Sequence, residues 1–270
     1  MAVHITSFRD GFTNRFTEIT SVGEVDDAQI NFGILKLQSE ERWSQTVDKE
    51  TAYLLLNGHI EVRFAKEVHQ YQRDSVFDSG PFCAHISAYN RVEIRAHSNA
   101  EVAVISVPNN KAFSNTVYLP KNVATEHRGQ DLLNNTCYRH VRTIFDGNNT
   151  PLNCELVLGE VVNFPGTWSS YPPHHHPQPE VYHYRFTDPR GYGHCELGEE
   201  VIKVRHYDTV KILDSVDHPQ CAAPGYGMYY IWMIRHLPAN RYSIPIFTDE
   251  HKWTLDPEAP VWKPNTGALN

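Results

Sequence analysis

Short runs of apolar, β-branched and aromatic residues, each ended by turn residues, recur along this chain of 270 residues. They include NFGILKLQ (31–38), TAYLLLNGHIEVRFA (51–65), EVAVISVP (101–108), CELVLGEVVNF (154–164), EVYHYRF (180–186), TVKILDSV (209–216) and GMYYIWMIRH (227–236). No long window has the apolar spacing of an amphipathic helix. Many short strands without alternating helices predict an all-β fold, either a sandwich or a barrel.

The two halves of the chain have the same strand-rich pattern, and residues 107–140 between them are rich in polar and turn residues. We therefore expect two stacked β-barrels. The first would span residues 1–128 and lack a metal motif, and the second would span residues 129–270 and carry a metal site. In the first half, Asn57-Gly58 separates two β-rich runs and predicts a hairpin turn, because both residues tolerate positive φ.

Composition excludes several functions. The formal net charge is −8 with no basic stripe, which argues against a nucleic-acid partner. No apolar run approaches the roughly 20 residues needed to cross a membrane. The polar N-terminus lacks the apolar segment of a secretory signal, so we expect a cytoplasmic protein. The 5 cysteines include no C-x-x-C pair and predict free thiols.

Histidines and one glutamate in the second half form a pattern typical of a metal site. His174 and His176 are two residues apart, so they face the same side of an extended chain, and Glu180 begins the next strand-like run. His218 follows about forty residues later. Nearby prolines restrict the loop that carries the first two imidazoles. This nitrogen and oxygen donor set suits one divalent ion, namely Zn²⁺, Mn²⁺, Fe²⁺, Co²⁺ or Ni²⁺.

Neighbouring residues extend this prediction. His175 should face away from the two ligands. Tyr182 and Tyr184 share the strand parity of Glu180, so each either packs in the core or places a phenol near the metal as a proton donor or relay. We take both as catalytic candidates. Arg139 and Arg235 suit either a substrate carboxylate or an ordinary surface ion pair.

Several segments resemble a known family. They are GTWSSYPPHHH (166–176), EVYHYRF (180–186) and APGYGMYYIWMI (223–234), with shorter matches at NNTCYRHV (134–141) and HKWT (251–254). These segments resemble the 5-deoxy-glucuronate isomerases of bacterial myo-inositol breakdown. The resemblance implies a bicupin of two stacked double-stranded β-helix (jelly-roll) barrels. It also implies zinc at His174, His176, Glu180 and His218, and aldose–ketose isomerisation of a deoxy-uronic acid.

The chain departs from the family pattern beside these ligands, for example at His175, at residues 214–217 and at Trp232. Such changes bear on the substrate more than on the metal or the fold. Two other functions stay open: an Fe²⁺-dependent cupin dioxygenase, and a metal-stabilised sugar-acid binding protein without turnover. The expected partner is a small sugar acid, with no membrane partner, and homo-oligomerisation is left open.

Overall fold

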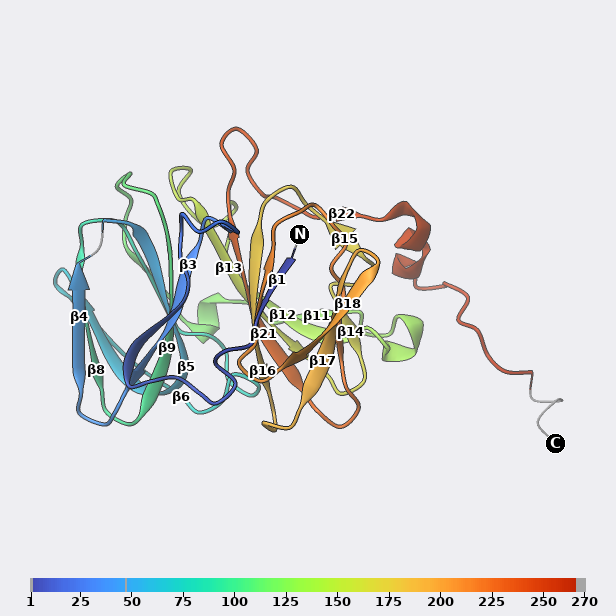
Figure 1. Cartoon of the computed structure of the whole chain (residues 1–270), viewed down its shortest axis with the longest axis horizontal. Helices are drawn as coiled ribbons and strands as arrows, with labels where there is room; N and C mark the ends of the chain where they lie inside the picture. Colours follow the sequence, from blue (N-terminus) through green and yellow to red (C-terminus); the bar gives the residue numbers. More distant parts are fainter. Residues whose placement is uncertain (1, 47, 266–270) are drawn as a thin grey trace.

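The computed structural model describes residues 2–46 and 48–265, and strands dominate this part of the chain (Figure 1). The helices within it are short 3₁₀ segments, η1 (Pro120–Asn122), η2 (Leu133–Asn135) and η3 (Asp249–Leu255). None of them has the length and apolar character needed to span a bilayer. The prediction of a mostly β protein is confirmed.

The first half of the chain forms one nine-stranded sheet. Its strands are β2 (Arg15–Thr20), β3 (Asn31–Leu37), β4 (Arg42–Thr46), β5 (Glu50–Phe64), β6 (Glu67–Arg73), β7 (Cys83–Ile86), β8 (Arg91–Ala96), β9 (Ala100–Val107) and β10 (Thr116–Tyr118). The main order is β10-β7-β5-β9-β3-β2, and the second part of β5 also pairs with β6 and β8. The long β5 therefore belongs to both faces of this half.

The hairpin predicted at Asn57-Gly58 is wrong, because β5 runs through both residues without turning back. The pairing of β5 with β9 shifts register between Leu55 and Asn57, which marks a bulge. Gly58 has a φ of +100°, and a Cβ there would lie 2.5 Å from the carbonyl oxygen of Asn99. The positive φ thus bends a strand from one face to the other.

The second half has a seven-stranded sheet with the order β1-β19-β16-β21-β13-β12-β11 and a four-stranded sheet with the order β14-β20-β17-β18. A third pair joins β15 to β22. The strands are β11 (Glu126–Arg128), β12 (Arg139–Phe145), β13 (Leu156–Asn163), β14 (Trp168–Ser169), β15 (His174–His175), β16 (Glu180–Phe186), β17 (Tyr192–Leu197), β18 (Glu200–Arg205), β19 (Thr209–Ile212), β20 (Gln220–Ala222), β21 (Met228–Arg235) and β22 (Ile246–Phe247).

The first strand, β1 (Ala2–Ile5), lies in the sheet of the second half and pairs with β19 (Figure 1). Buried Asp208 holds the segment that follows β1. Its carboxylate accepts hydrogen bonds from Arg9 at 2.6 Å and lies 2.7 Å from Nε2 of His4. Charge-assisted bonds of this kind fix the N-terminal segment against the second half.

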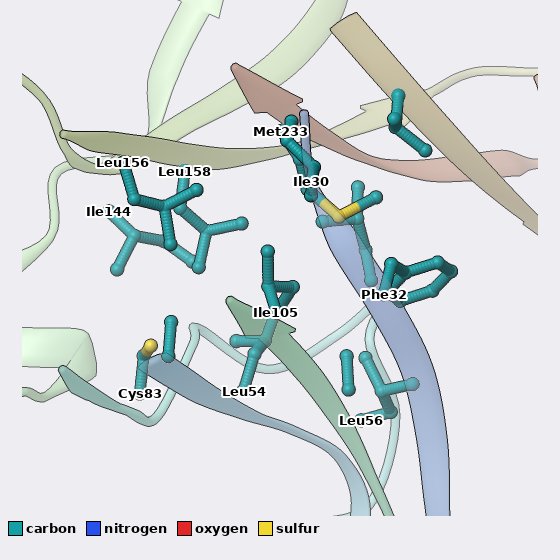
Figure 2. Close-up of a cluster of buried hydrophobic side chains, with 14 of the residues drawn as sticks. Ile30, Phe32, Leu54, Leu56, Cys83, Ile105, Ile144, Leu156, Leu158 and Met233 are labelled. Atoms are coloured by element: carbon teal, nitrogen blue, oxygen red, sulfur yellow. The ribbon is translucent and has the colours of Figure 1, made fainter. Parts of the chain in front are cut away.

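The large sheets of the two halves pack against each other through buried apolar side chains. Ile30, Leu54 and Ile105 of the first half meet Leu156, Leu158 and Met233 of the second half in one cluster (Figure 2). Separate clusters fill the interior of each half. Strand β16 is buried along its whole length although it contains Glu180, His183 and Arg185, and one face carries Tyr182 and Tyr184 into the interior of the second half.

Candidate metal centre

The four residues predicted as ligands come from three segments that meet at one end of the second half. His174 lies in β15, and His176 follows that strand directly. Glu180 is the first residue of β16, and His218 lies just before β20. The backbone N–H of His218 donates to the carbonyl of His174 at 3.3 Å. Two distant stretches of sequence are thereby joined at the site.

The side chains of this group converge. Nε2 of His176 lies 3.2 Å from Oε2 of Glu180, and Nε2 of His218 lies 3.3 Å from the same oxygen. The donor atoms of these three residues all lie within 4.8 Å of one another. The ring of His174 is centred 5.0 Å from that of His218 and meets it edge to face. All four residues are largely shielded from solvent, and only His174 keeps part of its surface exposed.

Each of the three imidazoles has its Nδ1 atom beside a backbone carbonyl. For His174 the carbonyl is that of Pro172 at 3.2 Å, for His176 that of Gln178 at 3.0 Å, and for His218 that of Val216 at 2.8 Å. A carbonyl only accepts, so each Nδ1 carries a proton, and in the neutral ring each Nε2 keeps a lone pair. This tautomer and this orientation are the ones a metal-ligating histidine requires.

Burial dominates the electrostatics of the centre. Burial and, to a smaller extent, the neighbouring His218 together lower the pKa of His174 to about 3. Burial alone would raise the pKa of Glu180, but the imidazoles of His176 and His218 outweigh it and lower the pKa to about 2. The centre therefore offers a carboxylate and at least one neutral imidazole at neutral pH, which are the protonation states that a divalent cation selects.

His175 faces away from this centre, as predicted. Its Nδ1 lies 2.8 Å from Oδ1 of Asp217, and Asp217 also accepts a hydrogen bond from the hydroxyl of Thr248. The side chain of His175 is one-third exposed. These contacts tie the β15 segment to the residue before His218 and to the chain after β22, so His175 helps to hold the ligand segments together.

The two tyrosines chosen from strand parity occupy different places. Tyr182 lines the pocket beside His174, His176 and Glu180, and its ring centre lies 5.9 Å from that of His218. Burial and the Glu180 charge raise the pKa of Tyr182, so its hydroxyl stays protonated. Tyr184 lies deeper and donates to Oε1 of Gln220 at 2.8 Å. The catalytic role predicted for Tyr184 stays a prediction.

Spacing along the sequence missed several residues of the same pocket. Tyr242 lies in the connection between β21 and β22, and its ring centre is 5.0 Å from that of His176. Tyr230 and Trp232 reach the pocket from β21 and Arg128 reaches it from β11, and among these three only the two β21 residues had a signal, the aromatic run at 227–236. Arg139, considered from the sequence as a partner for a substrate carboxylate, reaches the pocket from β12.

The other polar residues considered in the sequence have structural partners. Arg185, which lies between Tyr184 and Phe186 on β16, is absent from the pocket wall and bonds Glu101 of the first half at 2.6 Å. Arg235 pairs with Glu155 at 2.7 Å, so of the two roles considered for it the structure has the ordinary ion pair. All five cysteines are free, as expected.

A second group of ligand-type atoms lies at the junction of the halves and contains Glu50, His85 and Cys154. Nε2 of His85 lies 2.7 Å from Glu50, and Asn109 donates to the same carboxylate at 2.7 Å. The backbone N–H groups of residues 155 and 156 also donate to it. These four donors satisfy the carboxylate, so the group is a buried structural link.

The mostly β fold, with a buried cluster of imidazoles and a carboxylate at the end of the second half, is a cupin-type fold. Similar solved structures support this class. A Cupin 2 conserved barrel domain protein from Leptotrichia buccalis has a TM-score of 0.51 at 13% identity, covering 86% of this chain and 96% of that one. At such low identity the likeness concerns the fold alone.

The chain belongs to the KduI/IolB family, whose sequence model matches residues 4–254. The 5-deoxy-glucuronate isomerase of Bacillus subtilis strain 168 is 27% identical over 250 residues, which cover 86% of this chain and 89% of the relative. The enzyme of that name from Geobacillus kaustophilus strain HTA426 is 28% identical over 230 residues, covering 78% and 80%.

The solved structure of an IolB-like protein from Salmonella typhimurium LT2 superposes with a TM-score of 0.82 at 22% identity, covering 93% of this chain and 98% of that one. The resemblance stated from the sequence is therefore confirmed by family membership. The family and its named relatives also confirm the expectation that this protein is an enzyme of the isomerase class, an intramolecular oxidoreductase.

Proposed function

We propose that this protein is a metal-dependent aldose–ketose isomerase that converts 5-deoxy-glucuronate to 2-deoxy-5-keto-gluconate. The observation that carries the proposal is the cluster of His176, Glu180 and His218, whose donor atoms lie within 4.8 Å of one another, beside a pocket lined by His176 and Glu180. The substrate follows from the names of the relatives, which match this chain over most of its length. We further propose a role in the breakdown of myo-inositol, in the cytoplasm.

The donor set fits a divalent ion. The unshared Nε2 lone pairs of His174, His176 and His218, with a carboxylate oxygen of Glu180, form the set that zinc accepts, and Mn²⁺, Fe²⁺ or Ni²⁺ also suit it. Nε2 of His218 is buried and has no hydrogen-bond partner among the described residues, which an ion would remedy. When bound, the ion supplies Lewis-acid stabilisation of negative charge on the substrate oxygens.

Isomerisation also requires a proton to move between two neighbouring carbons, and Glu180 is not free for this if it ligates the ion. We propose Tyr182 and Tyr242 for proton transfer, because both line the pocket from different sides. Burial raises the pKa of each phenol, so each hydroxyl holds its proton at neutral pH. Each can therefore donate a proton to a substrate oxygen. The proton that moves from one carbon to the next needs a separate base, which the ion would supply by lowering the pKa of a water molecule bound to it.

Tyr184 is assigned here to positioning. Its hydroxyl fixes Gln220, whose Nε2 in turn donates to the backbone carbonyl of His218 at 2.8 Å. This chain of bonds reaches a proposed metal ligand without touching the pocket. A substitution of Tyr184 would then act through His218 and not on the substrate directly.

The architecture proposed for this function is the bicupin, with two double-stranded β-helix barrels divided near residue 128. The support is the packing of a seven-stranded sheet over a four-stranded sheet in the second half, and the shared β5 in the first. The metal centre would belong to residues 129–270. Strand β1 is the segment of the first unit that crosses to the second.

The test is to incubate the zinc-loaded full chain with 5-deoxy-glucuronate in D₂O and to follow the reaction by proton NMR. The expected result is a ketone product with deuterium at the carbon that receives the proton, and no uptake of oxygen. Oxygen consumption in step with product would favour the dioxygenase. Saturable binding of the acid without conversion would favour the binding protein.

A further inference from the structure

One arginine in the wall of the metal pocket has no carboxylate partner. Arg139 is only 7% exposed. Its Nη1 donates to the carbonyl of Cys137 at 2.8 Å, and its Nη2 donates to the carbonyl of Tyr171 at 2.9 Å. Its Nε is buried and has no hydrogen-bond partner among the described residues. The two carbonyls orient the guanidinium but do not neutralise its charge.

The other buried arginines in the described part of the chain are all paired with acids. Arg73 and Arg142 both contact Oε1 of Glu160, at 2.7 Å and 2.9 Å. Arg185 contacts Glu101 at 2.6 Å. Arg139 is therefore an exception within its own protein, and not an example of how this fold usually places arginine.

An unpaired buried cation is costly, because desolvation is not repaid by a counter-charge. Burial accordingly lowers the pKa of Arg139, although an arginine stays charged at neutral pH. A buried arginine without a counter-charge is explained if its missing partner is a bound ligand. The unused donors of Arg139 then point to an anion that enters the pocket.

The position of Arg139 limits which molecules can carry that anionic group. Arg139 lines the same pocket as His174, His176 and Glu180, so one small molecule can reach both. Arg128, its register partner on β11, lines the pocket too, but it is exposed and already bonded to Glu126 at 2.8 Å. The buried guanidinium is thus the better-defined anion site, with Arg128 adding positive charge near the entrance.

We propose that Arg139 binds the carboxylate of the substrate and so makes this pocket selective for sugar acids over neutral sugars. The inference rests on the proposed function in one respect, that the ligand is a sugar acid whose other end faces the metal centre. A guanidinium suits this task because its planar donors match a carboxylate. A charge-assisted contact of ordinary strength corresponds to a preference of roughly 10- to 150-fold.

The experiment compares the binding of D-glucuronate and of its neutral amide, D-glucuronamide, to the zinc-loaded full chain by calorimetry. The wild-type protein should bind the acid at least about 10-fold more tightly than the amide. In Arg139→Met this preference should disappear, with the acid losing affinity and the amide changing little. Arg235→Met is the matched control, because Arg235 has its own partner, Glu155, outside the pocket, and it should keep the preference.

A purely structural role for Arg139 would weaken both ligands equally, so the acid-to-amide ratio separates the two roles. An unchanged ratio in Arg139→Met, or no preference in the wild-type protein, overturns the inference. If Arg139→Met does not fold, a crystal structure of the wild-type protein with glucuronate decides. A carboxylate within about 3 Å of the Arg139 guanidinium supports the inference, and a carboxylate bound elsewhere overturns it.

The same measurements distinguish this inference from the proposed function. A preference for the acid that depends on Arg139, without isomerisation of 5-deoxy-glucuronate, supports the anion site and overturns the isomerase assignment. Isomerisation with no dependence of the acid-to-amide ratio on Arg139 supports the isomerase assignment and overturns the anion site.

Discussion

Nε2 of His218 lies 3.3 Å from Oε2 of Glu180, while Nδ1 of the same ring is held by the carbonyl of Val216 at 2.8 Å. The ring is therefore fixed from one side and presents Nε2 to a carboxylate on the other. The contact is stable only with a positive charge between the two atoms. That charge is either a proton on Nε2, since the Glu180 carboxylate outweighs burial and raises the pKa of His218, or a metal cation that takes the place of the proton. This relationship is the physical basis of the proposed metal centre.

Removal of one donor should release the metal and leave the fold intact. In His176→Ala we expect zinc affinity to fall by at least about 10- to 100-fold, since even residues that only support ligands have effects of that size. The apolar clusters of both halves do not include His176, so thermal unfolding of the metal-free protein should change little. Zinc per chain after dialysis, measured by mass spectrometry, checks the first expectation.

His175→Ala is the matched control for this variant. His175 is adjacent in sequence but supplies no donor atom, so the variant should lose clearly less zinc affinity than His176→Ala, and only through its lost contact with Asp217. Equal zinc loss in both variants would mean that the loop as a whole, and not the donor atom of His176, holds the ion. Full zinc retention in His176→Ala would remove that residue from the ligand set.

Tyr182→Phe and Tyr184→Phe should have different effects although both delete one hydroxyl from the same strand face. Turnover by Tyr182→Phe should fall by roughly 10²-fold at unchanged zinc content, because a proton donor is lost. Tyr184→Phe leaves Oε1 of Gln220 without its donor, which should cost about 1–3 kcal/mol of unfolding free energy. Steady-state rates and urea denaturation of both variants measure this contrast, and undiminished turnover by Tyr182→Phe would assign that residue to packing.

Much of this site was predictable because it is local in sequence. The pair His174 and His176 with Glu180 is encoded within seven residues, and strand parity predicted that Tyr182 would face the same way. Tyr242 could not be found in this way, since it reaches His176 from a connection more than sixty residues later. Only tertiary structure shows that this connection folds over the pocket.

The fold was predicted at the level of its class and missed in its connections. Alternating strands without helices indicate a mostly β chain, and this was confirmed. Asn57-Gly58 was misread because a positive φ serves a bulge as well as a turn, and the choice depends on the distant partner strand β9. The placement of β1 beside β19 has no local signal at all, because backbone pairing is independent of side-chain identity.

Acid should weaken the folded protein in part through His206. Its Nδ1 accepts a hydrogen bond from the backbone N–H of Phe186 at 3.0 Å and must be unprotonated to do so. Burial, with the nearby charge of Arg185, lowers its pKa to about 4, against about 6.5 in an unfolded chain. Between these values the unfolded chain binds a proton that the folded chain does not, so the free energy of unfolding falls as the pH drops from 6.5 to 4.

His206→Asn tests this contribution, because the amide oxygen replaces the acceptor without titrating in that range. Urea denaturation at several pH values should give the variant a shallower decrease below pH 6.5 and the same slope as wild type above it. Parallel curves for the two proteins throughout this window would show that His206 does not contribute to the acid sensitivity.

Stepwise return of zinc to metal-free protein tests the central claim most directly. Isomerisation of 5-deoxy-glucuronate should be absent in the chelator-treated chain, rise in proportion to bound zinc, and reach its maximum at one ion per chain. Circular dichroism should show the same strand content throughout, because the apolar clusters hold the fold without the ion. Full isomerisation by the folded, metal-free protein would contradict the account.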